Sequence, residues 1–283
     1  MNIPDQPAVE YANVSIRLGG RPVLSNLTFS VVPGEIFTII GYSGTGKSVT
    51  LQTMTGLLIP DGGSIKVFGQ QLVGMDDAEL EDVRRRFGYL FQSGALINWM
   101  TVRENVDLPL REHTAHSRMA RHRIVMEKLK LVSMEKDGDK YPSEISGGMK
   151  KRAALARAIV LDPQVVLFDE PTSGLDPVIA NQIDELIMSI NRELRVTCIV
   201  VTHDLESAFR MSDRIAFFWS GKMHYVGTPR EFSLCEDGEV LRFVSAGRSG
   251  ENARETLKRL AAMWEGKRRG IKAVPSEPEG LVR

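Results

Sequence analysis

A glycine-rich stretch that ends in lysine and serine carries the clearest chemistry in this sequence. Residues 41–48 read GYSGTGKS and match the phosphate-loop pattern G-x-x-x-x-G-K-[ST] at every fixed position. Because glycine has no Cβ, such a backbone can curl tightly and turn several N–H groups onto one polyphosphate. Lys47 would then reach the β- and γ-phosphates, and the hydroxyl of Ser48 would bind Mg²⁺. The stretch therefore predicts nucleotide binding rather than a chance glycine-rich turn.

A strand and a helix must flank this loop to hold it in place. Residues 35–40 (EIFTII) read as a buried strand, and residues 48–54 read as a helix. The helix would point its first N–H groups and the positive end of its dipole at the phosphates. The candidate phosphate-binding residues are Gly41, Ser43, Gly44, Thr45, Gly46, Lys47, Ser48 and Val49.

Two carboxylates follow a second apolar run. Residues 165–168 (VVLF) predict a buried parallel strand, and Asp169 and Glu170 come directly after it. Open α/β sheets bind their ligands at the carboxyl ends of such strands. We expect Asp169 to bind Mg²⁺ directly or through water, and Glu170 to orient and polarise the attacking water. An acidic loop after a core strand is common in isolation, but this one lies about 120 residues beyond a phosphate loop.

Gln92 and His203 lie at the ends of two more predicted strands. Gln92 ends the predicted strand at residues 87–92, and His203 follows the one at residues 196–201. A histidine at a strand tip can sense a γ-phosphate, whereas an ordinary surface histidine is the usual alternative. Its place beside the other motifs favours a role in the site.

Ser146, Gly147 and Gly148 precede a strong helical pattern at residues 150–159. A serine and two glycines at the start of a helix form a second terminus that suits an anion. A plain helix cap explains the same residues when they are taken alone, so this interpretation depends on the neighbouring motifs.

The remaining pattern predicts an α/β fold with antiparallel strands near the N-terminus. The segment from Gln92 to about Val160 has little strand signal, and we interpret it as a helical insert. Further strands are expected at residues 9–18, 21–24, 27–32 and 64–69, with a hairpin at 215–219 and 222–226 and helices at 79–86 and 178–194.

Composition narrows the classes of protein. The 283 residues, 42% of them hydrophobic, suffice for one large domain or two small ones with a packed core. A formal net charge of zero argues against nucleic acid as a partner. The start of the chain lacks a secretory pattern, and its apolar runs are far shorter than the roughly 20 residues that span a bilayer, so we expect a soluble chain. Cys198 and Cys235 have no metal-ligand spacing, which favours a reducing, cytoplasmic compartment.

Two outlying segments have more than one interpretation. Arg118, Arg121, His122 and Arg123 form a basic cluster, which we expect to be a solvated helix face, with a partner or acidic lipid heads as the alternative. Residues 251–264 predict an amphipathic helix that packs on its own domain or on a second subunit, with a membrane surface as the alternative. A mobile tail is expected after it. The apolar face of that helix consists of Leu257, Leu260, Ala261 and Trp264.

Taken in order, these motifs resemble the ATP-binding subunit of ABC transporters over roughly residues 8–245. The resemblance assigns residues 41–48 as Walker A, Gln92 as the Q-loop, 146–149 as the signature, 165–169 as Walker B, 173–176 as the D-loop and His203 as the switch histidine. It implies a P-loop NTPase fold with a RecA-like core, an antiparallel β-subdomain and a helical subdomain inserted at about residues 93–160. Residues 1–245 would form the ABC ATPase domain, and residues 246–283 a C-terminal extension.

The same resemblance implies ATP and Mg²⁺ as cofactors and a head-to-tail dimer of two copies. Each ATP would lie between Lys47 of one copy and Ser146 and Gly148 of the other. Gly147 and Asp176 are further candidates for contact with the nucleotide. The candidate Mg²⁺ ligands are Ser48, Gln92 and Asp169, and the candidate catalytic residues are Glu170, His203, Lys47 and Gln92.

A finer resemblance points to one branch of this family. Residues 90–96 (LFQSGAL), residues 109–114 (PLREHT) and the signature SGGM look like the Mla (maintenance of lipid asymmetry) ATPase of MCE-type phospholipid transport. That branch implies an integral membrane permease, a periplasmic MCE lipid-binding protein and often a small STAS-domain protein as partners. It places the chain on the cytoplasmic face of the inner membrane. An importer or exporter of another substrate is the alternative.

Two residues depart from the general ABC pattern. Leu18 stands near the position where these subunits usually stack an aromatic ring on adenine, and leucine stacks more weakly. Tyr11 lies early in its strand for that role. Met149 replaces the common signature glutamine, in agreement with the lipid branch.

Other classes of ATPase fit the sequence less well. DNA-repair and chromosome-organising ATPases carry long coiled coils between Walker A and the signature, whereas here the interval is about 100 residues and has no sustained heptads. Translation-factor ATPases carry two cassettes in one chain. A phosphotransferase kinase would share the phosphate loop but not the signature.

Overall fold

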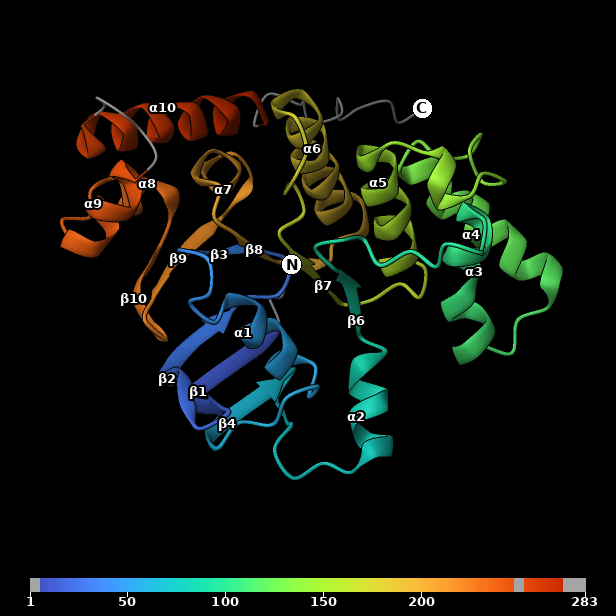
Figure 1. Ribbon diagram of the computed structural model, residues 1–283, viewed down its shortest axis with the longest axis horizontal. Helices are drawn as coiled ribbons and strands as arrows, with labels where there is room; N and C mark the ends of the chain where they lie inside the picture. Colours follow the sequence, from blue (N-terminus) through green and yellow to red (C-terminus); the bar gives the residue numbers. More distant parts are fainter. Residues whose placement is uncertain (1–5, 247–251, 272–283) are drawn as a thin grey trace, which may run out of the picture.

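A six-stranded sheet forms the centre of the molecule (Figure 1). The computed structural model describes residues 6–246 and 252–271, with side chains as far as residue 266. The strand order is β10-β9-β3-β8-β7-β6, and all neighbours are parallel except the β9–β10 hairpin. Its strands are β3 Ile36–Ile40, β6 Phe87–Leu90, β7 Val165–Asp169, β8 Thr197–Thr202, β9 Arg214–Trp219 and β10 Lys222–Gly227. The predicted hairpin and the three buried strands are confirmed.

A four-stranded antiparallel sheet, ordered β2-β1-β4-β5, covers one side of the central sheet. Its strands are β1 Val9–Leu18, β2 Arg21–Val31, β4 Gly62–Val67 and β5 Gln70–Gln71. The expectation of two strands at 21–24 and 27–32 was wrong, because β2 runs through both. Asn26 adopts a left-handed conformation with φ 51°, which asparagine tolerates, so the chain kinks there without leaving the sheet.

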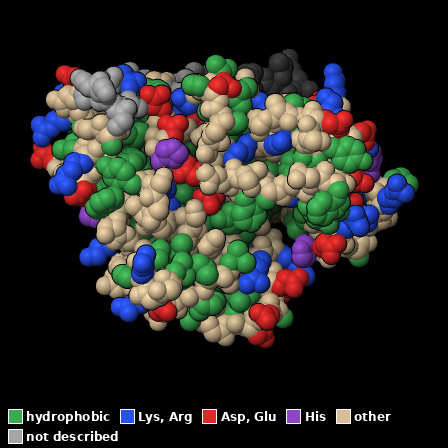
Figure 2. All heavy atoms as spheres, in the orientation of Figure 1, with side chains coloured by type: hydrophobic (Ala, Val, Ile, Leu, Met, Phe, Trp, Pro, Cys, Tyr) green, Lys and Arg blue, Asp and Glu red, His purple; other side chains and the backbone are tan. Residues whose placement is uncertain are grey.

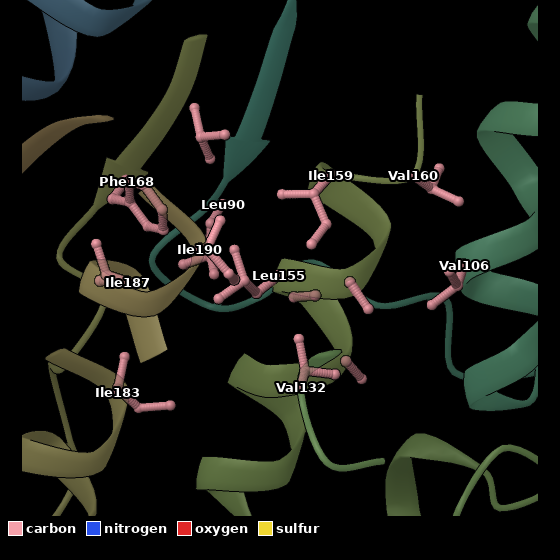
Figure 3. Packing of buried hydrophobic residues seen from close by; sticks show 14 of the residues in the cluster. Leu90, Val106, Val132, Leu155, Ile159, Val160, Phe168, Ile183, Ile187 and Ile190 are labelled. Carbon is pink, nitrogen blue, oxygen red and sulfur yellow. The ribbon is translucent and has the colours of Figure 1, made fainter. Parts of the chain in front are cut away.

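The described residues between β6 and β7 contain helices joined by loops and no strand, as the sequence predicts. They form α3 Val102–His113, α4 Arg118–Leu131, the 3₁₀ turn η1 Pro142–Glu144 and α5 Gly147–Ala158. Figure 3 shows Leu155 of α5 and Ile159, which follows that helix, packed between the strand residues Leu90 and Phe168 and the helical residue Val106. One apolar cluster therefore joins these helices to the sheet.

The remaining helices are α1 Lys47–Met54, α2 Asp77–Arg84, α6 Pro177–Leu194, α7 Leu205–Met211, α8 Pro229–Ser233, α9 Gly238–Ser245 and α10 Ala253–Ile271. Among them, α1 and α2 share the apolar cluster of the antiparallel sheet, and the others pack in the two further clusters. Within residues 6–246 and 252–271, no helix combines the length and the apolar character needed to cross a bilayer.

The predicted C-terminal amphipathic helix is confirmed as α10, and it packs on its own chain. Leu257 and Leu260 are buried against Phe209 of α7 and Phe232 of α8, and Trp264 Nε1 donates a hydrogen bond to Ser212 O at 3.1 Å. Figure 1 shows α10 lying across α7 and α8. The tail expected to be mobile lies outside the described residues from position 272 onward.

The basic cluster on α4 is mostly exposed. Arg118, His122 and Arg123 are exposed, whereas Arg121 Nε donates to Asp107 Oδ1 on α3 at 3.0 Å. Three of the four members are thus exposed on the described chain, and the choice between a solvated face and a face for a partner or acidic lipid heads stays a prediction.

A buried carboxylate fastens α6 to α7. Asp184 on α6 is fully buried, and its Oδ2 accepts hydrogen bonds from Ser207 Oγ at 2.8 Å and Arg210 Nη1 at 2.5 Å. Its Oδ1 has no hydrogen-bond partner. Burial raises the pKa of Asp184 to about 6, although the contacts with Ser207 and Arg210 act to lower it. The charged carboxylate therefore costs the fold free energy that the two contacts only partly offset.

Because of this cost, the free energy of unfolding should depend on the protonation of Asp184 and therefore on pH. The folded-state pKa of Asp184 lies above the value of about 4 of an unfolded aspartate, so the penalty is full above about pH 6 and absent below about pH 4. Asp184→Asn removes the titration. The free energy of unfolding of this variant, relative to the parent, should therefore rise by up to about 3 kcal/mol between pH 4 and pH 7.

Urea unfolding at both pH values measures this difference. Glu185→Gln, one position along α6 and exposed, is the matched control and should show no such rise. Parallel pH profiles for Asp184→Asn and the parent would contradict the assignment.

Candidate active site

The phosphate loop connects β3 to α1 and packs tightly against the neighbouring strand β9. A Cβ on Gly41 would lie 2.2 Å from Phe218 O, so a larger residue cannot occupy this position without moving the loop. Lys47 Nζ donates to Gly41 O and Tyr42 O, both at 2.8 Å. Burial lowers the pKa of Lys47, while the carboxylates of Glu170 and Asp169 act in the opposite direction. The ammonium is thus held within the loop, close to both carboxylates.

Ser48 and Asp169 bring two oxygen ligands together. Ser48 Oγ donates to Asp169 Oδ1 at 2.9 Å, across the junction of α1 and β7. Burial raises the pKa of Asp169, although the hydrogen bond from Ser48 lowers it. A hydroxyl and a carboxylate are ligands that suit Mg²⁺, which prefers oxygen and relies on few protein groups beside the phosphates. This pair of donors fits the ion.

Glu170 is held in an unusual conformation beside the histidine. Its backbone φ is +49°, and its N–H donates to Val201 O at 2.9 Å. Its Oε2 lies 2.9 Å from His203 Nδ1 and accepts a weaker hydrogen bond from Thr202 Oγ1 at 3.3 Å. Adjacent parallel strands β7 and β8 therefore place the glutamate and the histidine in direct contact.

One open cavity of about 380 Å³ unites most of the candidate residues. Gln92, Glu170 and His203 face it together with the phosphate loop. Gln92 is exposed, and its Nε2 lies 3.5 Å from Ser173 Oγ of the D-loop. The cavity is lined by Val23, Ser43, Gly44, Gly46, Lys47, Ser48, Val49, Gln92, Glu170 and His203. Sequence reasoning missed Val23, because an aliphatic residue in a strand carries no chemical signal.

The signature residues lie apart from this cavity. Ser146 caps α5, where its Oγ accepts from Met149 N at 3.3 Å, and both Ser146 and Gly147 are exposed. A Cβ on Gly148 would lie 2.6 Å from Ile179 Cγ2, so a larger residue where α5 crosses α6 would displace the Ile179 side chain. Asp176 is exposed and caps α6, accepting from Val178 N at 3.0 Å. Within one chain, Ser146 and Asp176 therefore act as helix caps, as the alternative interpretation of the signature serine expects.

Neither Tyr11 nor Leu18, the two residues considered for adenine stacking, lines the cavity. Tyr11 is buried, stacks on Phe29 with ring centroids 4.6 Å apart, and donates to Thr50 O at 2.8 Å. It therefore fastens the antiparallel sheet to α1. Leu18 is 40% exposed at the end of β1.

Comparisons with known proteins agree with this geometry. The sequence model described as "ABC transporter" matches residues 24–173. The mkl protein of Mycobacterium leprae, named a probable ribonucleotide transport ATP-binding protein, is 40% identical over 270 residues, which cover 93% of this chain and 78% of that protein. MlaF of Escherichia coli K12, an intermembrane phospholipid transport system ATP-binding protein, is 39% identical over 236 residues, or 83% and 88% of the two chains.

A solved structure extends the comparison to a nucleotide-bound cassette. The dimeric post-hydrolysis state of the ATP-binding cassette MJ0796, bound to ADP and Pi, superposes with a TM-score of 0.71 at 33% identity. The match covers 78% of this chain and 98% of that one. The motifs, their meeting at one edge of the sheet and these matches together show that the chain belongs to the ABC transporter family, as an ATP-binding and ATP-hydrolysing subunit.

Proposed function

We propose that this chain powers phospholipid transport between two membranes by hydrolysing ATP in a dimer bound to a permease. The observation that carries the hydrolytic part is the contact between Glu170 and His203 at the cavity that Lys47 also lines. The lipid part rests on the resemblance of residues 90–96 and the signature, and on relatives named for phospholipid transport.

In this proposal each residue acts on the γ-phosphate or on the attacking water. The loop N–H groups and Lys47 stabilise charge on the transferring phosphoryl group. Ser48 and Asp169, with Gln92 nearby, would hold Mg²⁺, which supplies further positive charge to the phosphates. Glu170 orients the water through the carboxylate oxygen that His203 leaves free. His203 and Gln92 respond to the presence of the γ-phosphate.

A second copy would complete the site. Ser146 and Gly147 are exposed at the N-terminus of a 12-residue helix, where free N–H groups favour an anion. They lie outside the cavity of their own chain, which is what a contribution to the partner's nucleotide requires. Asp176 would lie at the same interface. The dimeric MJ0796 cassette supports this arrangement.

A separate groove suits the permease. A cavity of about 460 Å³ lies between α2, β6, α3 and α5, and Figure 2 shows this face hollowed between α2 and the end of α3. Tyr89, Phe91 and Leu108 supply apolar lining, and Phe91 is 40% exposed. Gln92 follows Phe91 directly, so a segment seated in the groove would press on the chain that enters the nucleotide cavity.

The cargo and the other partners follow from the lipid branch. A periplasmic MCE lipid-binding protein and a small STAS-domain protein would join the permease, with the ATPase on the cytoplasmic face of the inner membrane. Ribonucleotide transport is a second candidate, because mkl relatives match the chain at similar identity.

Glu170→Gln tests the hydrolytic role. The amide keeps the shape of the side chain but cannot accept a proton, so kcat should fall about 10²- to 10⁴-fold while ATP binding persists. ATP should also drive this variant into a dimer that gel filtration detects. Exposed Glu185→Gln is the control. Near-normal turnover of Glu170→Gln would remove the glutamate from its role.

Leu108→Asp tests the permease groove. Aspartate replaces one of the apolar residues among the charged lining and adds a charge that a bound permease segment would have to desolvate, so co-purification of the permease should weaken at least about tenfold. The ATPase rate of the isolated chain should change less than about twofold. Leu234→Asp places the same charge on a leucine that is 73% exposed and outside the groove, and it should retain the permease. Equal retention by both variants would place the permease elsewhere.

The cargo is tested on the complex pulled down through this subunit. Mass spectrometry should find phospholipid enriched in the complex over a detergent-matched control. Enrichment of ribonucleotides beyond ATP and ADP, without phospholipid, would favour the second candidate.

A further inference from the structure

Lys151 is a buried lysine that the proposed mechanism does not use. It lies in the second turn of α5, and its side chain is almost fully buried, with 6% of the residue exposed. Its Nζ donates to Glu170 O at 3.2 Å and makes a short hydrogen bond to Gln92 O. One ammonium from the signature helix therefore contacts the main chain of both the catalytic glutamate and the Q-loop.

The contact with Glu170 falls on a strained peptide. The φ of +49° at Glu170 is uncommon for a residue with a side chain and persists only where the surroundings fix it. On one side the N–H of Glu170 is bound to Val201 O of β8, and on the other the carbonyl is bound by Lys151. These two bonds set the direction in which the side chain leaves the backbone.

Both acceptors of Lys151 are main-chain carbonyls, so the ammonium holds the backbone of Glu170 and does not bind its carboxylate. The Glu170 carboxylate remains with His203 and Thr202. Burial lowers the pKa of Lys151, while the carboxylates of Glu170 and Asp169 act to keep it charged. A charged donor makes stronger hydrogen bonds than a neutral one, which suits a group that holds a strained backbone.

We propose that Lys151 is a positioning residue for ATP hydrolysis. It holds the Glu170 peptide and the Gln92 carbonyl in one arrangement and ties both to the helix that begins at Ser146. This inference rests on the proposed role of Glu170. Because α5 carries the signature residues at its start, a movement of α5 reaches the peptide of Glu170 directly through the Lys151 side chain.

Lys151→Met tests the proposal, with Lys128→Met as the matched control. Methionine keeps the length of the side chain but removes all donors. Lys128 on α4 is equally buried, with 4% exposed, and pairs with Asp162 at 2.5 Å outside the nucleotide cavity. Both variants lose a buried ammonium from the same helical segment, so both should lower the melting temperature.

The two variants should differ in turnover. Lys151→Met should lower kcat about tenfold, which corresponds to about 1.4 kcal/mol, with KM for ATP changed less than about twofold. Lys128→Met should keep kcat within about twofold of the parent. Lys151→Gln restores an uncharged NH2 donor group and should recover part of the loss. If Lys151→Met fails to fold, Lys151→Gln carries the same comparison with Lys128→Gln.

Equal kcat values for the Lys151 and Lys128 variants, or a rise in KM alone, would overturn the proposal. The double variant Glu170→Gln with Lys151→Met should be no more than about twofold slower than Glu170→Gln, since Lys151 acts through the glutamate. Multiplicative losses would overturn it too. Near-normal turnover of Glu170→Gln alone is a different failure, because it removes the proposed role of Glu170 itself.

Discussion

The site depends on a lysine and two carboxylates that lie close together at one edge of a parallel sheet, while other groups hold Lys47 and Asp169 apart from each other. Strands β3, β8 and β7 are neighbours, and the phosphate loop, His203 and the Asp169–Glu170 pair follow their carboxyl ends. Lys47 is bound by loop carbonyls, and Asp169 is bound by Ser48, so cation and anion stay close yet separately held. A polyphosphate with a divalent cation matches such a distribution of charge.

The sequence predicted the parts of this site that depend on local pattern. Apolar runs fixed the three strands, and the spacing of glycine, lysine and serine fixed the loop, because both depend on residues close in the chain. It could not give the order of the strands, since pairing joins segments such as residues 36–40 and 197–202 that are far apart. The contact between Glu170 and His203 follows only once that order is known.

The sequence also failed to indicate which polar side chains are buried. Tyr11 was considered for adenine stacking, yet its ring lies against Phe29 inside the molecule. Lys151 and Asp184 gave no signal, because a lysine or aspartate in a helical pattern normally faces solvent. Each instead joins two elements, α5 to the Glu170 peptide and α6 to α7. Such polar residues can be identified only from the packed structure.

The position of α10 on α7 affects how the protein is made. The apolar face that Leu257 and Leu260 cover belongs to α8 and to α7, which starts two residues after His203. On the ribosome that face stays open until residues 253–264 have emerged, long after the phosphate loop has been synthesised. The part of the site that carries His203 is therefore packed late in translation. Until then the nascent chain exposes the apolar face that α10 covers in the folded protein.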